Sequence, residues 1–201
     1  MTTQIVWIAP AIALVVGYLL GAIPFGVILT RLFGAGDLRT IGSGNIGATN
    51  VLRTGRKGLA AATLLLDLLK GACAVWLIEW LFPGNAALAA AGAFVGHCYP
   101  FWLGFRGGKG VATLMGIALA LQWPIAVVYA VLWLGLLATL RISSVAGMVA
   151  AISTPVSAAI FDRFELVILF LALALIVLWK HGENIERLLA GTESRLGRKD
   201  G

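Results

Sequence analysis

Charged side chains are scarce in this sequence: Asp, Glu, Lys and Arg make up 12% of the 201 residues, whereas hydrophobic residues make up 60%. A soluble domain of this size cannot bury so much apolar surface, and the mean hydropathy of +0.97 agrees. Cysteine is scarce too. Cys73 and Cys98 lie in or beside apolar segments without CxxC spacing, which indicates neither a disulfide framework nor a zinc site. The composition therefore indicates a polytopic membrane protein.

Apolar runs long enough to cross a hydrocarbon core, which needs about 20 residues, recur along the chain. We predict an all-α integral membrane protein, a seven-helix bundle forming a single domain (1–201) with an interfacial tail (180–201). The predicted spans are 4–33, 57–82, 86–103, 110–121, 124–140, 144–161 and 164–180. The first run is too long for a signal-peptide core and lacks a cationic n-region, so we interpret it as a retained span.

The 15 Lys and Arg residues are distributed unevenly over the predicted loops. With the N-terminus outside, one face receives the loop after the first span, the 104–109 loop, the turn at Arg141 and the C-terminal tail, whereas the opposite face carries only Arg163. The positive-inside rule makes the first face cytoplasmic. Topology alone would explain scattered cations, but not the glycines and uncharged polar residues beside them.

The long polar connector after the first span contains the sequence GSGNIGATNVLRTGRKG (42–58). Its glycines permit tight turns and a close approach of the backbone to an anion. Ser43, Asn45 and Asn50 supply neutral donors, and Arg53 supplies a planar guanidinium suited to phosphate. A flexible solvated linker is the alternative interpretation, but a linker would not interleave hydrophobic residues. We predict a phosphate-binding segment.

A second polar segment, GFRGGKGVAT (104–113), leads directly into a predicted helix. It is not a Walker loop, because Leu103 and Gly110 stand where that motif needs glycine and a hydroxyl residue. Amides at a helix start, together with a lysine, form an anion site without a metal. The residues concerned are Gly107, Gly108, Lys109 and Gly110. A basic membrane anchor or part of a pore are the alternatives.

Two further polar segments follow on the same predicted face. In RISS (141–144), helix capping explains one of Ser143 and Ser144, and the other is then available to a ligand. The sequence does not decide which serine does which.

The C-terminal sequence HGENIERLLAGTESRLG (181–197) follows the last predicted span. Its hydrophobic residues recur at helical spacing, so we expect a helix on the membrane surface. His181, Asn184 and Arg187 are spaced i, i+3, i+6 and share roughly one face. An imidazole, an amide and a guanidinium presented together suit a phosphate or an oxyanion. An ordinary interfacial histidine is the alternative for His181.

Three polar residues lie deeper in predicted spans. Asp67 and Lys70 are three residues apart and can pair on one helix face. Charges inside a span are expensive, so a functional role and a structural ion pair are both open. His97 stands beside Cys98, but adjacent helix residues point in different directions, which disfavours a His–Cys nucleophile pair.

Three stretches of the chain resemble the cytoplasmic motifs of the bacterial acyl-phosphate:glycerol-3-phosphate acyltransferases, the PlsY family. They are SGNIGATNVLR (43–53), GHCYPFWLGFRGGKGVAT (96–113) and HGENIERLLAGTE (181–193). The resemblance implies a seven-helix bundle with an outside N-terminus and a site at the cytoplasmic interface. It implies transfer of a fatty acyl group from acyl phosphate to the sn-1 hydroxyl of glycerol 3-phosphate, the first acylation of phospholipid biosynthesis.

The resemblance, together with the residues, gives each candidate a role. For the phosphate of glycerol 3-phosphate we expect Ser43, Arg53, Lys109 and His181 as ligands. For the hydroxyl or the oxyanion we expect Asn184 and Ser144 (or Ser143), and for the acyl phosphate Gly107, Gly108, Gly110 and Thr113 through backbone amides, with Asn45. Supporting roles go to Asp67, Lys70, His97 and Arg187. The base is either His181 or the substrate's own phosphate.

No metal or cofactor is expected, because acyl phosphate is a mixed anhydride with a good leaving group. We expect a monomer in the inner membrane of a bacterial cell, in contact with the lipid bilayer and without a nucleic acid partner. The pattern His-x4-Asp of other acyltransferases is absent at both histidines. A small anion or phosphate transporter or channel is the alternative function; it would place polar residues at the bilayer midplane of two repeated halves.

Overall fold

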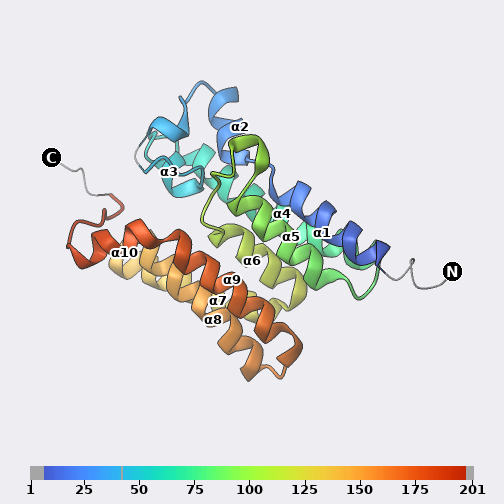
Figure 1. The fold of residues 1–201 in the computed structure, drawn as a ribbon. Helices are drawn as coiled ribbons and strands as arrows, with labels where there is room; N and C mark the ends of the chain where they lie inside the picture. Colours follow the sequence, from blue (N-terminus) through green and yellow to red (C-terminus); the bar gives the residue numbers. More distant parts are fainter. Residues whose placement is uncertain (1–6, 42, 198–201) are drawn as a thin grey trace. The chain divides into compact units, whose positions relative to one another are not determined.

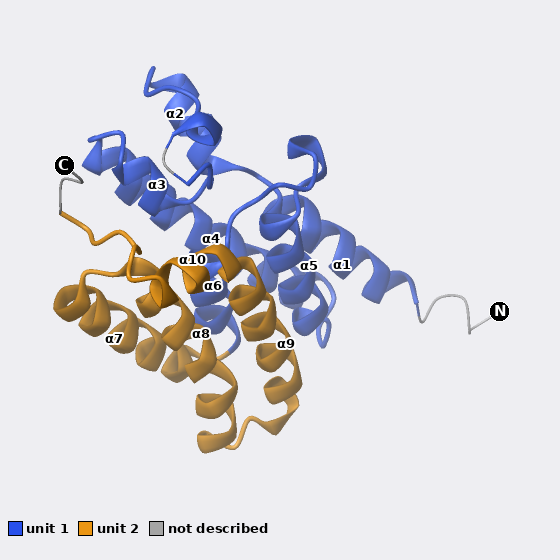
Figure 2. Cartoon of the chain, turned by 60° about the vertical axis from the view of Figure 1, so that its left-hand side comes forward, with its two compact units in different colours: residues 1–121 blue, residues 122–201 orange. Residues whose placement is uncertain are grey.

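The computed structural model describes residues 7–41 and 43–197, and all regular structure among them is helical (Figure 1). The chain divides into two compact units, Met1–Leu121 and Gln122–Gly201 (Figure 2). The first three residues of the predicted span 4–33 and the last four residues of the predicted tail lie outside the described residues.

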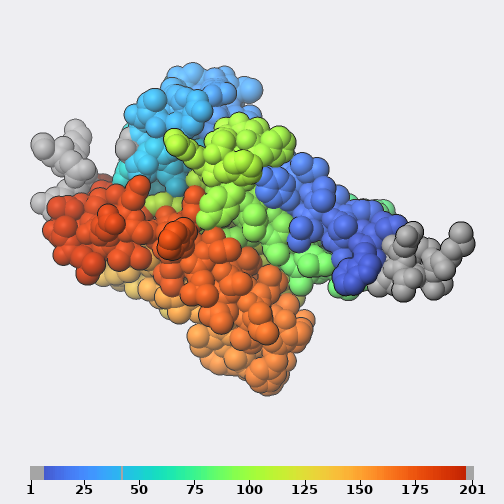
Figure 3. Space-filling model, viewed as in Figure 1, coloured from blue at the N-terminus to red at the C-terminus, as the bar shows by residue number. Residues whose placement is uncertain are grey.

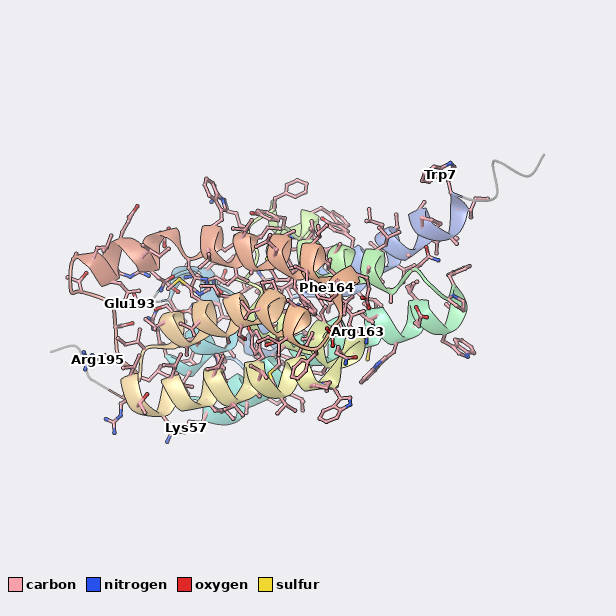
Figure 4. All side chains as sticks on the ribbon, turned by 90° about the horizontal axis from the view of Figure 1, so that it is seen from below. Trp7, Lys57, Arg163, Phe164, Glu193 and Arg195 are labelled. Atoms are coloured by element: carbon pink, nitrogen blue, oxygen red, sulfur yellow. The ribbon has the colours of Figure 1, made fainter. Side chains whose placement is uncertain are left out.

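The first unit contains six α-helices and two short 3-10 turns within the described residues. They are α1 (Ile8–Gly21), α2 (Phe25–Leu32), η1 (Leu38–Thr40), α3 (Ala48–Leu52), α4 (Lys57–Leu81), α5 (Ala86–Cys98), η2 (Phe101–Leu103) and α6 (Val111–Leu121). Helix α1 packs against α5, and α4 packs against α6. Trp7 and Lys57 lie at opposite ends of this unit (Figure 4).

Small residues allow α1 and α5 to pack backbone against backbone. A Cβ on Gly17 or Gly21 would overlap with the carbonyl oxygen of Ala89 or Ala93, and Gly92 of α5 meets α1 in the same way. Gly17 faces Ala89 and Gly21 faces Ala93, so residue numbers increase in the same direction along both helices, which therefore run parallel. Close approach of this kind is how helices associate in lipid, where burial of apolar surface gives no driving force.

Residues 22–24 separate α1 from α2. Two carbonyls in this break accept hydrogen bonds from side chains that are distant in the sequence. Trp102 Nε1 donates to the carbonyl of Ala22 at 2.7 Å, and Lys70 Nζ donates to the carbonyl of Ile23 at 2.9 Å. Tyr18 joins the same region, donating to the carbonyl of Tyr99 at 2.8 Å. The segment around residue 100 therefore lies directly against the region of α1 (Figure 3).

The connector between α2 and α4 is organised by one buried side chain, Asn50, which is 2% exposed. Its Nδ2 donates to the carbonyls of Leu38, Ile41 and Asn45 at 2.8–2.9 Å. From its place in the polar connector, Asn50 was expected to donate to a ligand. The structure instead uses its amide to fold the connector, because three backbone carbonyls would otherwise lie without partners.

The second unit consists of α7 (Trp123–Leu140), α8 (Ser143–Ile160), α9 (Phe164–Lys180) and α10 (Gly182–Leu189). Helix α8 packs against both α7 and α9, and short turns join the three. At His181 the chain bends by 58° between α9 and α10. Arg163 and Phe164 lie at one end of α9, and Glu193 lies beyond its other end (Figure 4).

Among residues 7–41 and 43–197, five helical segments are long and apolar enough to cross a membrane, or six if the bent pair α9–α10 counts as one span. Helix α6, at 11 residues, is shorter. Apart from the start of the first span, predicted at residue 4 while α1 begins at Ile8, the predicted boundaries agree with the helices to within about one residue, with two interruptions. Residues 22–24 divide the first predicted span into α1 and α2, and residues 99–100 separate α5 from η2. The protein is an all-helical, multi-pass integral membrane protein.

The α1–α5 interface yields a prediction about stability. Gly21→Ala should lower the free energy of unfolding by about 1–3 kcal/mol, because the new methyl group overlaps with the backbone of α5. Gly135→Ala is the matched control, since nothing lies within 4 Å of the position of its Cβ, and it should be neutral or stabilising by up to about 1 kcal/mol. Thermal unfolding in detergent measures both, and equal effects would contradict the packing argument.

Candidate active site

The 107–110 loop is bonded to the end of α5. The amide of Gly107 donates to the carbonyl of Cys98 at 3.1 Å, and the amide of Gly108 donates to the carbonyl of His97 at 3.1 Å. A Cβ on Gly108 would overlap with the imidazole of His97, so only glycine fits there. Gly110 has φ of +85°, a left-handed conformation that glycine adopts without strain, and the chain then enters α6.

This bonding differs from the use that the sequence predicted for two of the amides. Gly107 and Gly108 were expected to offer their N–H groups to acyl phosphate, but both donate to carbonyls of α5. The physical reason is that the last carbonyls of a helix lack partners within the helix and need donors from elsewhere. The glycines therefore serve close packing, and Lys109 is the half-buried cation of the loop.

The 43–53 segment presents polar side chains on the outside of the folded connector. Ser43 and Arg53 are exposed, and Arg53 is the C-terminal cap of α3. Asn45 is partly buried, and its Oδ1 accepts from the amide of Gly47 at 2.9 Å. The same segment packs on α2, where a Cβ on Gly26 would overlap with the carbonyl oxygen of Ile46.

Asp67, Lys70, His97 and Thr113 are buried together in the first unit. Lys70 Nζ lies 2.6 Å from Asp67 Oδ1, which confirms the predicted pair, and His97 Nδ1 lies 3.8 Å from the same oxygen. Thr113 Oγ1 donates to the backbone carbonyl of Asp67 at 3.0 Å. The hydroxyl of Thr113, in α6, is thus bonded to α4.

In the second unit three predicted site residues converge on one carboxylate, that of Glu193. Ser144 Oγ and Asn184 Nδ2 donate to Glu193 Oε1 at 2.7 and 2.6 Å, and Arg187 Nε donates to Oε2 at 2.7 Å. The side chain of Glu193 is only 6% exposed. The predicted shared face of Asn184 and Arg187 is confirmed by their common partner.

The serine pair at the start of α8 does not behave as capping predicts. Ile142 is the N-cap, and no side chain bonds there. Ser144 is buried and donates to Glu193 instead. The expectation that one of these serines is an N-cap is therefore wrong, because the carboxylate offers the hydroxyl a stronger, charge-assisted bond.

His181 is 3% exposed at the junction of α9 and α10. Its Nδ1 lies 2.7 Å from the carbonyl oxygen of Val177. Because a carbonyl only accepts, Nδ1 carries a proton in this arrangement, and a neutral His181 has its lone pair on Nε2. The helix end thus fixes the tautomer and the orientation of the ring.

The candidates are distributed over the two units. In the first unit they are Ser43, Asn45, Arg53, Asp67, Lys70, His97, Gly107, Gly108, Lys109, Gly110 and Thr113, and in the second Ser144, His181, Asn184 and Arg187. Glu193 is the residue that the sequence analysis missed. Its signal was its position at the end of the C-terminal motif HGENIERLLAGTE (181–193), six residues after Arg187. Among the described residues no three acidic, histidine or cysteine side chains are grouped to hold a metal.

Glu193 gives a prediction about pH and stability. Burial alone raises the pKa of this carboxyl, but the bonds from Ser144, Asn184 and Arg187 outweigh burial, so the pKa falls below its ordinary 4.5. A lowered pKa means that the carboxylate stabilises the fold above about pH 4.5, and that this contribution is lost as the pH falls through the folded pKa.

Glu193→Gln should therefore lower the free energy of unfolding by about 1–3 kcal/mol at pH 7, because bonds to a charged group are lost. It should also flatten the fall in stability between about pH 5 and 3. Glu186→Gln, an exposed change on α10, should stay within about 0.5 kcal/mol. Denaturation followed across this pH range in detergent is the measurement, and identical profiles for the two variants would contradict the assignment.

Comparison with known proteins identifies the family. The sequence model of the family described as glycerol-3-phosphate acyltransferase matches residues 11–191. A glycerol-3-phosphate acyltransferase of Rhodopseudomonas palustris is 58% identical over 93% of this chain and 96% of its own length. The corresponding protein of Mesorhizobium japonicum is 54% identical over 94% of this chain and 96% of its own length.

Two crystal structures of PlsY (YgiH), an integral membrane glycerol 3-phosphate acyltransferase, are also similar. The glycerol 3-phosphate form is 34% identical with a TM-score of 0.88, covering 94% of this chain and 96% of that one. The lysophosphatidic acid form is 33% identical with a TM-score of 0.86, covering 94% and 95%. These matches favour the enzyme over the anion transporter, and the chain belongs to the glycerol-3-phosphate acyltransferase family.

Proposed function

We propose that this glycerol-3-phosphate acyltransferase takes its acyl group from acyl phosphate and transfers it to the sn-1 hydroxyl of glycerol 3-phosphate. The products are lysophosphatidic acid and inorganic phosphate. The observation that carries the proposal is the full-length match to a structure in its glycerol 3-phosphate form and to one in its lysophosphatidic acid form, which are acceptor and product. The choice of donor is supported by the cation-rich motifs and the absence of His-x4-Asp.

Ser43, Arg53, Lys109 and His181 bind the phosphate of glycerol 3-phosphate in this proposal. Ser43 and Arg53 are exposed on a connector that Asn50 holds in shape. A guanidinium can bind two phosphate oxygens at once, whereas the lysine supplies a point charge. The fixed tautomer of His181 leaves Nε2 as the ring atom that faces away from Val177 and can reach the substrate.

Asn184 and Ser144 position the acceptor hydroxyl or the oxyanion. Both donate to Glu193, and Arg187 neutralises the charge of that carboxylate, so the two side chains are held in defined rotamers. The single proton of Ser144 points to Glu193, which leaves its oxygen as an acceptor for the substrate hydroxyl. Arg187 and Glu193 are positioning residues here.

Gly107, Gly108, Gly110, Thr113 and Asn45 shape the acyl phosphate site in the proposal. Since the amides of Gly107 and Gly108 are bonded to α5, these glycines act by letting the loop pack closely against α5, which sets the position of the acyl phosphate site. The amide of Thr113 lies in the first turn of α6, where N–H groups lack partners within the helix and attract anions.

The reaction needs little covalent chemistry from the protein. The hydroxyl oxygen attacks the acyl carbonyl, the carbon–oxygen bond to phosphate breaks, and phosphate leaves with its electron pair. Holding the two substrates in line removes about 7–11 kcal/mol of the barrier, and one oxyanion donor about 3–4 kcal/mol more. The hydroxyl proton passes either to His181 or to the phosphate of the substrate. No step requires a metal or an organic cofactor.

Topology completes the proposal. Counting α1–α2 as one broken span and α6 as a short span gives seven crossings, with the N-terminus outside. Lys57, Lys109 and the tail from 180 then share the cytoplasmic face, as the positive-inside rule requires. We propose that both units act as one monomeric domain in the inner membrane of a bacterial cell, with the site open to the cytoplasm and to the bilayer.

A direct assay tests the function. Purified protein in detergent receives a fatty acyl phosphate and radiolabelled glycerol 3-phosphate, without magnesium, acyl-CoA or acyl carrier protein. We expect labelled lysophosphatidic acid. Product formed only with acyl-CoA would overturn the choice of donor, and uptake of phosphate by proteoliposomes without any product would point back to a transporter.

Arg53→Ala should raise the KM for glycerol 3-phosphate by about 10- to 100-fold, because a charge-assisted bond to phosphate is lost. The KM for acyl phosphate should change by less than about threefold. Arg31→Ala, an exposed cation at the end of α2, is the matched control and should leave both constants unchanged. Equal effects of the two variants would mean that Arg53 contributes only general surface charge.

His181→Ala should raise the same KM by about tenfold or more. If His181 is also the base, kcat falls by a further factor of about 10²–10⁴ and the acidic limb of the pH–rate profile disappears. Initial rates between pH 5 and 9 separate the two roles. A variant that loses affinity but keeps its maximal rate and its pH profile leaves the substrate's phosphate as the base.

A further inference from the structure

The buried network of Asp67, Lys70 and His97 takes no part in the chemistry proposed above. Each of the three side chains is at most 5% exposed, and each comes from within a helix of the first unit. Charged side chains at such positions are costly unless their partners compensate. Asp67 and Lys70 compensate one another at 2.6 Å, which explains how they are tolerated but not what they do.

The network contacts the backbone at two places where the helices are interrupted. At one end, Lys70 donates to the carbonyl of Ile23, in the break between α1 and α2. At the other end, the ring of His97 fills the space beside Gly108, and the carbonyl of His97 accepts the amide of the same glycine. Asp67 stands between them, 3.8 Å from His97 Nδ1.

This arrangement bears on Lys109, the next residue after Gly108. The backbone of Gly108 is held on one side by a hydrogen bond and on the other by the edge of an imidazole. Thr113, which follows the loop, is bonded to the carbonyl of Asp67 at 3.0 Å. The loop that carries Lys109 is therefore fixed at both ends to residues of the network.

We propose that Asp67, Lys70 and His97 are positioning residues for the 107–110 loop. Lys70 holds the carboxylate of Asp67, Asp67 orients the ring of His97, and the ring sets the position of the backbone at Gly108 and hence of Lys109. The inference rests on the proposed role of Lys109 as a ligand for the phosphate of glycerol 3-phosphate. An ion pair that served stability alone would leave the affinity of folded protein for that substrate unchanged.

The contact between Gly108 and the ring of His97 can be tested by adding a methyl group at one residue and removing the ring at the other. Gly108→Ala adds a methyl group where the ring of His97 stands, and His97→Ala removes the ring. Each single variant should weaken binding of radiolabelled glycerol 3-phosphate by at least about tenfold, and the double variant should recover about tenfold relative to Gly108→Ala. Gly58→Ala, where nothing lies within 4 Å, is the control for an added methyl group. Losses that simply multiply in the double variant would overturn the proposal.

Asp67→Asn keeps the volume of the side chain and guards against the case in which the alanine variants fail to fold. It should raise the KM for glycerol 3-phosphate by about tenfold with less than about threefold change in the KM for acyl phosphate. Asp67→Glu, which retains the charge, should recover part of the loss. Unchanged kinetic constants in a variant that is merely less heat-stable would show a purely structural ion pair.

The binding measurement separates this inference from the proposed donor. Binding of glycerol 3-phosphate requires no acyl phosphate. A wild-type protein that binds the acceptor but makes no product would therefore contradict acyl phosphate as the donor, and the binding losses of the Gly108 and His97 variants would still decide whether the network positions the loop. A wild-type protein that makes product, with variants that bind as well as wild type, would overturn only the positioning argument.

Discussion

Backbone polar groups in a bilayer have no water to bond with, so every interruption of a helix needs partners from the protein itself. This constraint explains where the long-range contacts of the first unit lie. The carbonyls of Ala22 and Ile23, between α1 and α2, accept from Trp102 and Lys70, and the carbonyls at the end of α5 accept from the amides of Gly107 and Gly108. The irregular backbone at these two interruptions is thus hydrogen-bonded to the rest of the first unit.

The buried carboxylates serve the same purpose. Asp67 is paired with Lys70, and Glu193 is paired with Arg187 and bonded to Ser144 and Asn184. Each carboxylate orients hydrogen-bond donors of the kind that also bind phosphate. Each ion pair has no net charge. The net charge of +6 is therefore carried by the rest of the chain. An enzyme that acts on glycerol 3-phosphate, an anion, gains from this separation, because its internal charges cancel while its exposed loops stay positive.

Much of the fold could be predicted from the sequence, because apolar length and the position of glycine are local properties. Helices α4, α6, α7, α8 and α9 begin and end within one residue of their predicted limits. The predicted pair of Asp67 and Lys70, and the shared face of Asn184 and Arg187, also followed from helical spacing alone. Where local patterns misled, a partner distant in sequence had intervened, as at Ser144, which bonds to Glu193 across 49 positions.

The sequence by itself determined that the chain is a helical membrane protein and where its polar, glycine-rich motifs lie, since hydropathy, charge and motif spacing can be read without coordinates. Tertiary structure alone decided which polar groups are committed to the fold: Asn50 to the connector, the amides of Gly107 and Gly108 to α5, and Glu193 to α8 and α10. The reason is physical. The sequence shows which hydrogen-bonding groups a residue has, but not whether their partner is a substrate or a carbonyl many residues away. That depends on which groups the packed helices bring together.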